Sequence, residues 1–148
     1  MHESPQSVQT DRGSETNRTK RIALRARTLA VAYLLLLFAA THIPSTGIGP
    51  SSINDKSAHF GGYFLLAVLL LAGWELTIGK LQPRHYFAVW LAGVLYGAFD
   101  EWTQIPVWRT CDMNDWGADV LGVTVGIVAY QMLRPLLFAI IGRDGAAQ

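Results

Sequence analysis

Acidic side chains gather in two short stretches of a chain that is otherwise strongly apolar. One stretch, GAFDEWTQIPVWRTCDMNDWGADVLG, runs from Gly97 to Gly122 between two apolar runs, and the other, INDKSAHFGGY, opens an earlier run. Carboxylates beside a histidine can transfer protons, and several carboxylate oxygens together can hold a hard cation such as Mg²⁺ or Ca²⁺. The carboxylates and the histidine that could do this are Asp55, His59, Asp100, Glu101, Asp112, Asp115 and Asp119, and the cations Lys56 and Arg109 lie among them. Whether they meet depends on the elements that carry them.

The composition indicates that these elements lie in a membrane. Hydrophobic residues make up 51% of the 148 residues and charged residues only 16%, against about 25% in a typical soluble domain. Apolar runs cover about 28–43, 58–78, 86–105 and 116–141, and Pro135 is expected to kink or end the last one. A helix of a soluble protein needs a polar face, which segments such as LLAVLLLAG lack. The last three runs reach the about 20 residues of a membrane span, and the first is shorter.

Basic residues beside the apolar runs predict the orientation of the chain. They are concentrated in the N-terminal tail, in the loop that carries Lys80 and Arg84, and near the C-terminus at Arg134 and Arg143. Because basic residues are retained on the cytoplasmic side, both termini are predicted to be cytoplasmic and both acidic stretches to lie on the outer side. The predicted fold class is therefore all-α, a polytopic membrane protein with four transmembrane helices in a compact bundle.

The domain organisation follows from the same runs. Residues 1–27 lack apolar periodicity and are predicted to be a basic, disordered cytoplasmic tail that could be helical near its end. Residues 28–141 form the four-helix transmembrane domain, and 142–148 a short C-terminal tail. The first run could be a cleaved signal peptide, but the long tail before it favours a retained helix. With a net charge of +1 and no basic face, no nucleic-acid partner is predicted, and the single Cys111 excludes a disulfide framework.

Helical spacing predicts that the polar residues converge. Residues four apart share a helix face, and a carboxylate that faces lipid costs about 2.5 kcal/mol or more. Glycines at the same spacing let membrane helices approach closely. The polar series are Asp55–His59–Tyr63, Tyr96–Asp100–Gln104 and Asp115–Asp119, with Glu101 beside the second, and the glycine pairs are Gly93/Gly97 and Gly122/Gly126. Three helices are thus expected to close around one acidic pocket.

Several charged residues have a second interpretation. Asp55, Asp112 and Asp115 could cap helices, and Lys56 and Arg109 could be anchors at the membrane interface. The residues furthest into the helices are Asp100, Glu101 and Asp119, which favours a function for them. Near the inner end, Glu75 is expected to reach water or to pair with a basic neighbour such as Arg84.

The residues of the pocket resemble those of a known family. DKSAHFGGYFLLA, then DEWTQ, then an arginine followed by D..D...D..G...G resemble the VanZ-like family of small bacterial membrane proteins, over roughly His42 to Leu133. The matching residues are Asp55, Lys56, His59, Phe60, Tyr63, Asp100, Glu101, Gln104, Arg109, Asp112, Asp115, Asp119, Gly122 and Gly126. Three departures are the spacing between Gln104 and Arg109, which is one residue tighter than the commonest pattern, Trp108, where a glycine is usual, and Asp119, where the family often carries asparagine. The resemblance implies a role in the bacterial cell envelope, associated with tolerance of the glycopeptide teicoplanin, but no agreed reaction.

Three functions and a structural alternative remain open. The first is catalysis on, or binding of, a phosphate-bearing envelope lipid, with Glu101, Asp100 and His59 as acid or base. In that case Asp100, Glu101 and Asp119 would hold Mg²⁺ or Ca²⁺, and Arg109 with Lys56 would grip the phosphate. The residues predicted to bind ligand are Asp55, Lys56, Tyr63, Gln104, Arg109, Asp112, Asp115 and Asp119.

The other functions need no reaction on a lipid. An acidic cleft could bind a cationic or amphiphilic molecule, including an antibiotic, without catalysis. Proton-coupled transport is a further possibility, although the ionisable groups cluster at one end of the membrane. In the structural alternative, the polar cluster does no more than lock three helices together. Whether the protein is an enzyme is therefore left open, whereas a multi-pass location in the bacterial inner (cytoplasmic) membrane is predicted.

Overall fold

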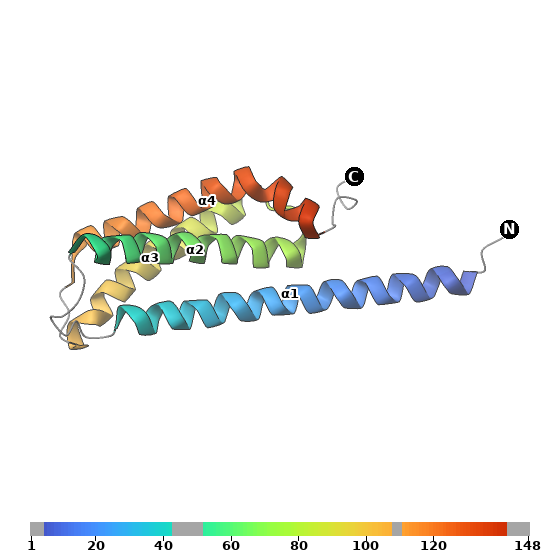
Figure 1. Ribbon diagram of the computed structural model, residues 1–148, viewed down its shortest axis with the longest axis horizontal. Helices are drawn as coiled ribbons and strands as arrows, with labels where there is room; N and C mark the ends of the chain where they lie inside the picture. Colours follow the sequence, from blue (N-terminus) through green and yellow to red (C-terminus); the bar gives the residue numbers. More distant parts are fainter. Residues whose placement is uncertain (1–4, 43–51, 108–110, 142–148) are drawn as a thin grey trace.

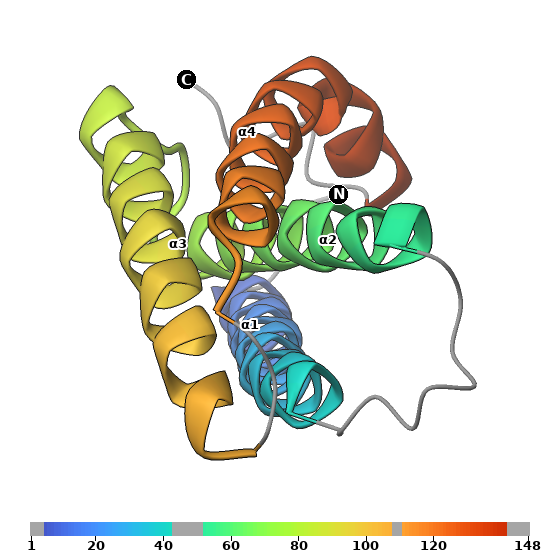
Figure 2. The ribbon, with the colours of Figure 1, turned by 90° about the vertical axis from the view of Figure 1, so that its left-hand side faces the viewer.

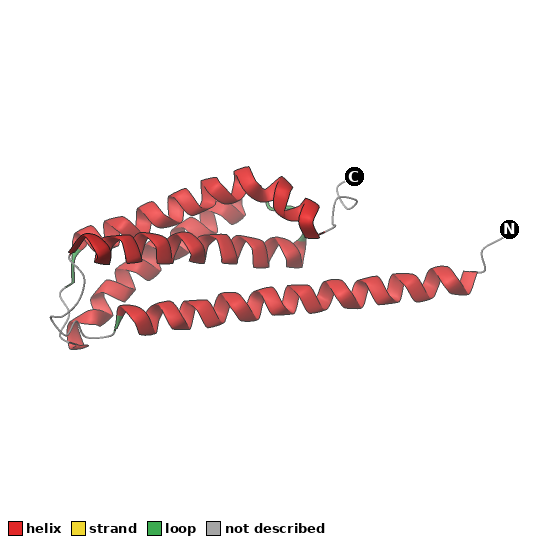
Figure 3. Cartoon of the chain, in the orientation of Figure 1, coloured by secondary structure: helices red, strands yellow, loops and turns green. Residues whose placement is uncertain are grey.

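The described part of the chain folds into four long helices and a short 3-10 turn (Figure 1; Figure 3). The computed structural model describes residues 5–42, 52–107 and 111–141. The elements are α1 (Pro5–Thr41), α2 (Ser52–Ile78), α3 (Pro83–Gln104), η1 (Ile105–Val107) and α4 (Met113–Ile141). The all-α class predicted from the sequence is confirmed.

The first helix is longer than the sequence predicted. A disordered tail was expected over residues 1–27, but α1 begins at Pro5 and continues for 37 residues to Thr41. A helix that has already formed gains one hydrogen bond for each residue that extends it, so the polar part of α1 can continue the apolar part without an apolar face of its own. The segment that can cross a membrane is correspondingly longer than the predicted 28–43, at 22 residues from Lys20 to Thr41.

Three of the helices are long and apolar enough to cross a membrane. Besides the segment of α1, these are Asp55–Ile78 of α2 and Met113–Leu136 of α4. They identify the chain as a membrane protein with several candidate spans. Pro135 lies inside α4 and does not end it, and Figure 1 shows α4 changing direction near its red end.

The helix α3 differs from the others in composition but not in its outward face. It has 22 residues, and its last turns hold Asp100 and Glu101, which lower its mean hydropathy. Phe87, Leu91 and Leu95, spaced four apart along one face, are nevertheless 40–61% exposed. A fourth membrane span therefore stays a prediction, and that apolar face supports it.

The bundle is organised around α2. Figure 2 shows α2 between α1 and α4, with α3 along one side. The helices α2 and α4 make the most extensive contact of any pair. Their backbones approach closely at two glycines: a Cβ added at Gly122 would lie 2.4 Å from the carbonyl oxygen of Phe60, and one added at Gly126 would lie 2.6 Å from that of Phe64. The predicted packing role of this glycine pair is confirmed. The close approach fixes which side chains of α2 and α4 meet.

A tight connection returns the chain from α2 into α3. Gly79 adopts a φ of 83°, a conformation that only glycine takes without strain. The backbone N–H of Gln82 then donates to Nδ1 of His85 at 2.9 Å, which caps the start of α3 after Pro83. The histidine thus caps the helix and packs against Trp74, with the ring centroids 4.9 Å apart and the ring planes tilted by 45°.

Candidate functional site

The predicted polar residues of three helices meet at one end of the bundle. Figure 1 shows the first turns of α2 and α4 and the last turns of α3 at the same end of the bundle. The buried polar residues at this end are Thr41, His59, Asp100, Glu101, Gln104, Asp115 and Asp119. All but Thr41 belong to the polar residues that the sequence analysis singled out.

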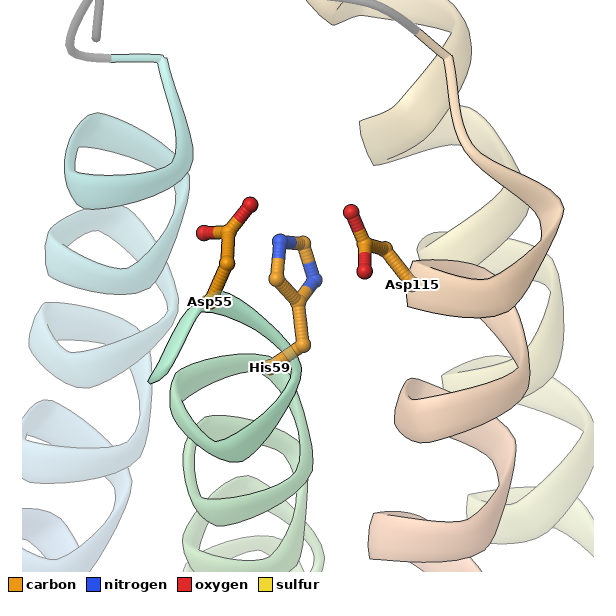
Figure 4. A group of neighbouring side chains, drawn as sticks. All are labelled: Asp55, His59 and Asp115. Atoms are coloured by element: carbon orange, nitrogen blue, oxygen red, sulfur yellow. The ribbon is translucent and has the colours of Figure 1, made fainter. Parts of the chain in front are cut away.

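His59 is the centre of this acidic site. Its side chain is only 2% exposed, and its Nδ1 lies 3.0 Å from Oδ1 of Asp119 and 3.8 Å from Oε1 of Glu101. Figure 4 shows its ring between the carboxyl groups of Asp55, from the same helix, and Asp115, from α4. A carboxylate bonded to one ring nitrogen fixes the orientation of an imidazole and leaves the other nitrogen for a ligand or a proton.

Glu101 joins α3 to the start of α4. The side-chain amide of Gln104 donates to its Oε1 at 3.2 Å, and the backbone N–H of Asp112 donates to its Oε2 at 2.9 Å. Glu101 therefore holds the segment that follows η1 against the site. Glu101 is only 2% exposed, but these two donors supply the hydrogen bonds that a buried carboxylate needs.

Asp100 connects the site to α1, a helix that was not among the three predicted to form the acidic pocket. The hydroxyl of Thr41 donates to Oδ1 of Asp100 at 2.9 Å, and Nδ1 of His42 lies 3.7 Å from the same oxygen. His42 also contacts Oγ1 of Thr103 through Nε2, at 3.0 Å. The available signal was the position of Thr41 and His42, two polar residues at the end of the first apolar run and at the membrane edge predicted for Asp100.

Lys56 is paired within the protein. Its Nζ donates to Oδ1 of Asp115 at 2.9 Å and to Oδ2 of Asp112 at 3.2 Å. Asp112 in turn accepts the backbone N–H of Asn114, so it caps α4, which was one of the two interpretations for it. That hydrogen bond, followed by the one from Lys56, lowers the pKa of Asp112 below its usual value. The predicted grip of Lys56 on a phosphate thus competes with two carboxylates.

Three buried polar atoms at the site have no hydrogen-bond partner among the described residues. They are Oδ2 of Asp119 and the hydroxyl oxygens of Tyr63 and Tyr96, whose rings lie 5.9 Å apart. An unpaired buried polar group costs about 1–3 kcal/mol. Because buried groups in native proteins are almost always paired, these atoms are where a ligand, an ion or a water would bind.

Among the described residues, two groups of side chains could hold a metal ion. The ligand atoms of His59, Glu101 and Asp119 lie within 4.8 Å of one another, and so do those of Asp55, His59 and Asp115. The predicted set contained Asp100 in place of His59. An imidazole ligand suits Zn²⁺ and other transition ions better than the predicted Mg²⁺ or Ca²⁺, which prefer oxygen. Arg109, predicted to bind phosphate, lies outside the described residues.

A second buried carboxylate lies near the opposite end of α2. Glu75 is 2% exposed and accepts the hydroxyl of Tyr130 at 2.7 Å and Nε of Arg134 at 2.6 Å. The expected pairing of Glu75 with a basic residue is confirmed, but the partner is Arg134 and not Arg84, the residue named as an example. Both donors come from α4, because the glycines of α4 bring that helix against α2, whereas Arg84 donates to Nε2 of His85 at 3.4 Å.

Comparisons with known proteins place this geometry in a family. The VanZ/LLP1 family model matches residues 4–134. An uncharacterized protein of Schizosaccharomyces pombe is 27% identical over 107 residues, which are 72% of this chain and 64% of the relative. The chain thus spans slightly less than two thirds of the relative that it matches. No solved structure matches the chain.

Proposed function

The chain belongs to the VanZ/LLP1 family, and on that premise we propose that it handles a phosphate-bearing, lipid-linked molecule at the acidic end of its helix bundle. The role is the modification or protection of a cell envelope. The observation that carries the proposal is the buried His59, held by Asp119 and close to Glu101, beside polar atoms that no described residue satisfies.

The proposed location follows from the helix ends. All four helices cross the bacterial inner (cytoplasmic) membrane, both termini are cytoplasmic, and the acidic site lies below the outer interface. The apolar outward face of α3 supports the fourth span. Cys111 is exposed beside the acidic site, so a membrane-impermeant maleimide should label it in intact cells. Labelling only after permeabilisation would reverse the topology.

The chemistry of the site fits transfer of a proton to or from an oxygen of the headgroup. With Nδ1 of His59 bonded to Asp119, Nε2 is the nitrogen that exchanges the proton, and Glu101 is the second acid or base. Asp100 orients Gln104 and takes no direct part. Because Lys56 is paired with Asp112 and Asp115, we assign the contact with the phosphate to Arg109. A guanidinium group can bind two phosphate oxygens at once. A divalent ion bound by His59, Glu101 and Asp119 would neutralise part of the negative charge.

The presence of a relative in fission yeast bears on the ligand. A molecule common to bacteria and eukaryotes explains the presence of a relative in fission yeast more simply than an antibiotic does. Lipid-linked, phosphate-bearing molecules fit that requirement. We therefore propose that the lipid-linked molecule is the ligand, and that tolerance of teicoplanin is an indirect consequence of changed envelope lipids.

The test compares the lipids of cells that express matched variants. Membrane extracts from cells with the natural protein, His59→Gln, Glu101→Gln and Gly61→Ala are compared by mass spectrometry after equal insertion is verified. Gly61 is the control because nothing lies within 4 Å of an added Cβ. The natural protein and Gly61→Ala should change the same phosphate-bearing lipid-linked species, and the two site variants should not. If no species separates the natural protein from His59→Gln, the proposal fails.

A second candidate function is non-catalytic binding of a cationic or amphiphilic molecule. The excess of carboxylates over cations in the described part of the site favours it, since Lys56 is shared by Asp112 and Asp115. This function predicts saturable binding of teicoplanin without a product, weakened by salt and by Asp100→Asn. Titration of the purified protein in detergent, with the bound antibiotic counted, decides between binding and turnover.

Proton-coupled transport receives less support from the packing. Between the acidic site and Glu75 the core consists of Leu66, Ala67, Leu71, Val123 and Ile127. Within the described residues these side chains separate the two polar regions, and a proton path needs a chain of polar groups or water.

A further inference from the structure

An apolar groove opens between α1 and α3 on the side of the bundle away from the acidic site. It has a volume of about 610 Å³ and is floored by α2. Its walls are Ala30 and Val31 of α1, Leu70 and Trp74 of α2, and Ala88 and Ala92 of α3, and Arg27 completes the lining. The volume lies within the range of sites that hold small molecules.

The groove exists because α1 and α3 diverge. They meet near the acidic site, where Thr41 reaches Asp100 and His42 reaches Thr103, and Figure 2 shows them separating from there. Farther along, α1 stays against α2, since a Cβ at Gly73 would lie 3.6 Å from the carbonyl oxygen of Ala26. The alanines that face the gap are too small to fill it. In a bilayer, such a gap is filled by hydrocarbon.

One residue that lines this apolar groove, Arg27, is a cation. Arg27 lies within the candidate span Lys20–Thr41 and is exposed. Among the described residues, the polar partner of its guanidinium is the hydroxyl of Thr77, 3.0 Å from Nε. An ionisable residue within a span normally has a counter-charge or a function. The remaining N–H groups of Arg27 are therefore suited to an anion.

The other charged residues around the groove also favour an anionic ligand. Arg84, which is exposed, precedes Ala88 by four residues and so shares the face of α3 that lines the groove. Glu75, the buried acid at this end, is already bonded to Arg134 and Tyr130. The opening of the groove is thus cationic and its interior apolar.

We propose that this groove binds an anionic phospholipid, with one acyl chain between α1 and α3 and the phosphate on Arg27. A guanidinium binds phosphate oxygens in a bidentate manner, and the apolar walls exclude water from the chain. The site is separate from the acidic site. It does not depend on the proposed function.

The experiment uses Trp74 as a reporter inside the groove. The full-length protein is reconstituted in vesicles of phosphatidylcholine that contain increasing fractions of phosphatidylglycerol or phosphatidylcholine with brominated acyl chains, which quench tryptophan on contact. Subtracting the fluorescence of Trp74→Phe isolates the quenching of Trp74. The brominated phosphatidylglycerol should quench it at an about fivefold lower mole fraction than the brominated phosphatidylcholine, as expected for one basic contact.

Two variants assign the preference to the groove. Arg27→Gln should abolish the fivefold preference, whereas Arg21→Gln, which removes an exposed cation of the same helix outside the lining, should keep it. Equal quenching by the two lipids in the natural protein would show that Trp74 meets bulk lipid only and would overturn the proposal. Absence of quenching by either lipid would mean that protein, such as a second copy of the chain, fills the groove. His59→Gln should leave the preference unchanged, so failure of the acidic site is recognised separately.

A measurement without tryptophan supports the same decision. Phosphatidylglycerol added to the detergent-solubilised protein should raise its melting temperature in proportion to occupancy, more for the natural protein than for Arg27→Gln. An equal rise for both proteins would count against the site even if Trp74→Phe proved unstable.

Discussion

Glu75 and Asp119 are both fully buried carboxylates in one helix bundle, but their surroundings differ. Both oxygens of Glu75 accept hydrogen bonds, from Tyr130 and Arg134. Asp119 has His59 on one oxygen, and its other oxygen has no partner among the described residues. Near Glu75 a cation balances the acid. Near Asp119 the neighbours include further acids.

This difference separates a structural network from a site. A closed network, in which every polar atom has a partner, ties two helices together and leaves nothing for a ligand. An incomplete network costs folding free energy and persists where the unpaired atoms have a use. Burial of a carboxylate therefore does not by itself identify a functional residue in this protein. The fraction of its hydrogen bonds supplied by the chain is the better criterion.

The largest effect is expected where the closed network is broken. Arg134→Ala would leave Glu75 buried with an uncompensated charge, and removing one partner of a buried pair costs about 3–5 kcal/mol. The cost should lie near 3 kcal/mol because the Arg134 side chain is 32% exposed and water can partly replace it. Denaturant unfolding in detergent micelles measures the change.

The control for this variant is a double replacement. Glu75→Leu with Arg134→Leu removes both charges, so it should recover most of the lost free energy of unfolding. Lys80→Ala, a change of an exposed cation near the same end of α2, should cost little. If Arg134→Ala unfolds no more easily than Lys80→Ala, the Glu75 network does not tie α2 to α4.

A smaller effect is expected where α2 and α4 touch. Gly122→Ala would place a Cβ 2.4 Å from the backbone oxygen of Phe60, so the helices must separate at a cost of about 1–3 kcal/mol. Phe60 follows His59, and Gly122 lies one turn after Asp119, so the separation should disturb the acidic site first. The lipid-species comparison described above should show reduced function.

Gly61→Ala is the matched control for the helix contact. It lies on the same helix as Phe60 with nothing within 4 Å of an added Cβ. Alanine favours a helix over glycine by about 1 kcal/mol, so this variant should be neutral or slightly more stable. Equal losses of stability in the two variants would mean that glycine is needed for helix conformation and not for close approach.

The sequence predicted the local part of this site better than the non-local part. The four-residue spacing of Asp55 with His59 and of Asp115 with Asp119 is a property of one helix, and the penalty for a charge in lipid turns both faces inward. Such reasoning needs no knowledge of how the helices cross. It brought the acids of α2, α3 and α4 to one end of the bundle correctly.

The errors concern contacts that depend on helix crossing. Glu75 is 59 residues from Arg134, and only the register of α2 on α4 brings them together. The entry of Thr41 into the site and the gap beside Trp74 both result from the angle between α1 and α3. The N-terminal part of α1 was missed for another reason. Apolar periodicity does not detect a polar helix that extends an apolar one.

The smallest effect on stability is expected at Asp119, where a substitution should leave the free energy of unfolding nearly unchanged or increase it. Asp119→Asn keeps an oxygen for His59 and removes one of several like charges, so the free energy of unfolding should stay within about 1 kcal/mol or increase. Glu75→Gln is the matched change in the closed network. It should cost about 1.5–3 kcal/mol, because hydrogen bonds to a charged group are replaced by neutral ones. Parallel unfolding curves with unchanged slopes compare the two directly.

The function of the two variants should be affected in the reverse order. Asp119→Asn should weaken, without abolishing, the change in lipid-linked species that the natural protein causes, since the charge that polarises His59 is lost while the asparagine oxygen still orients its ring. Glu75→Gln should preserve that change at temperatures where it remains folded, because Glu75 is separated from the site by the apolar core. Should Asp119→Asn prove the less stable variant and keep its function, the incomplete network would be structural after all. The contrast between the two carboxylates would then have to be explained by helix packing alone.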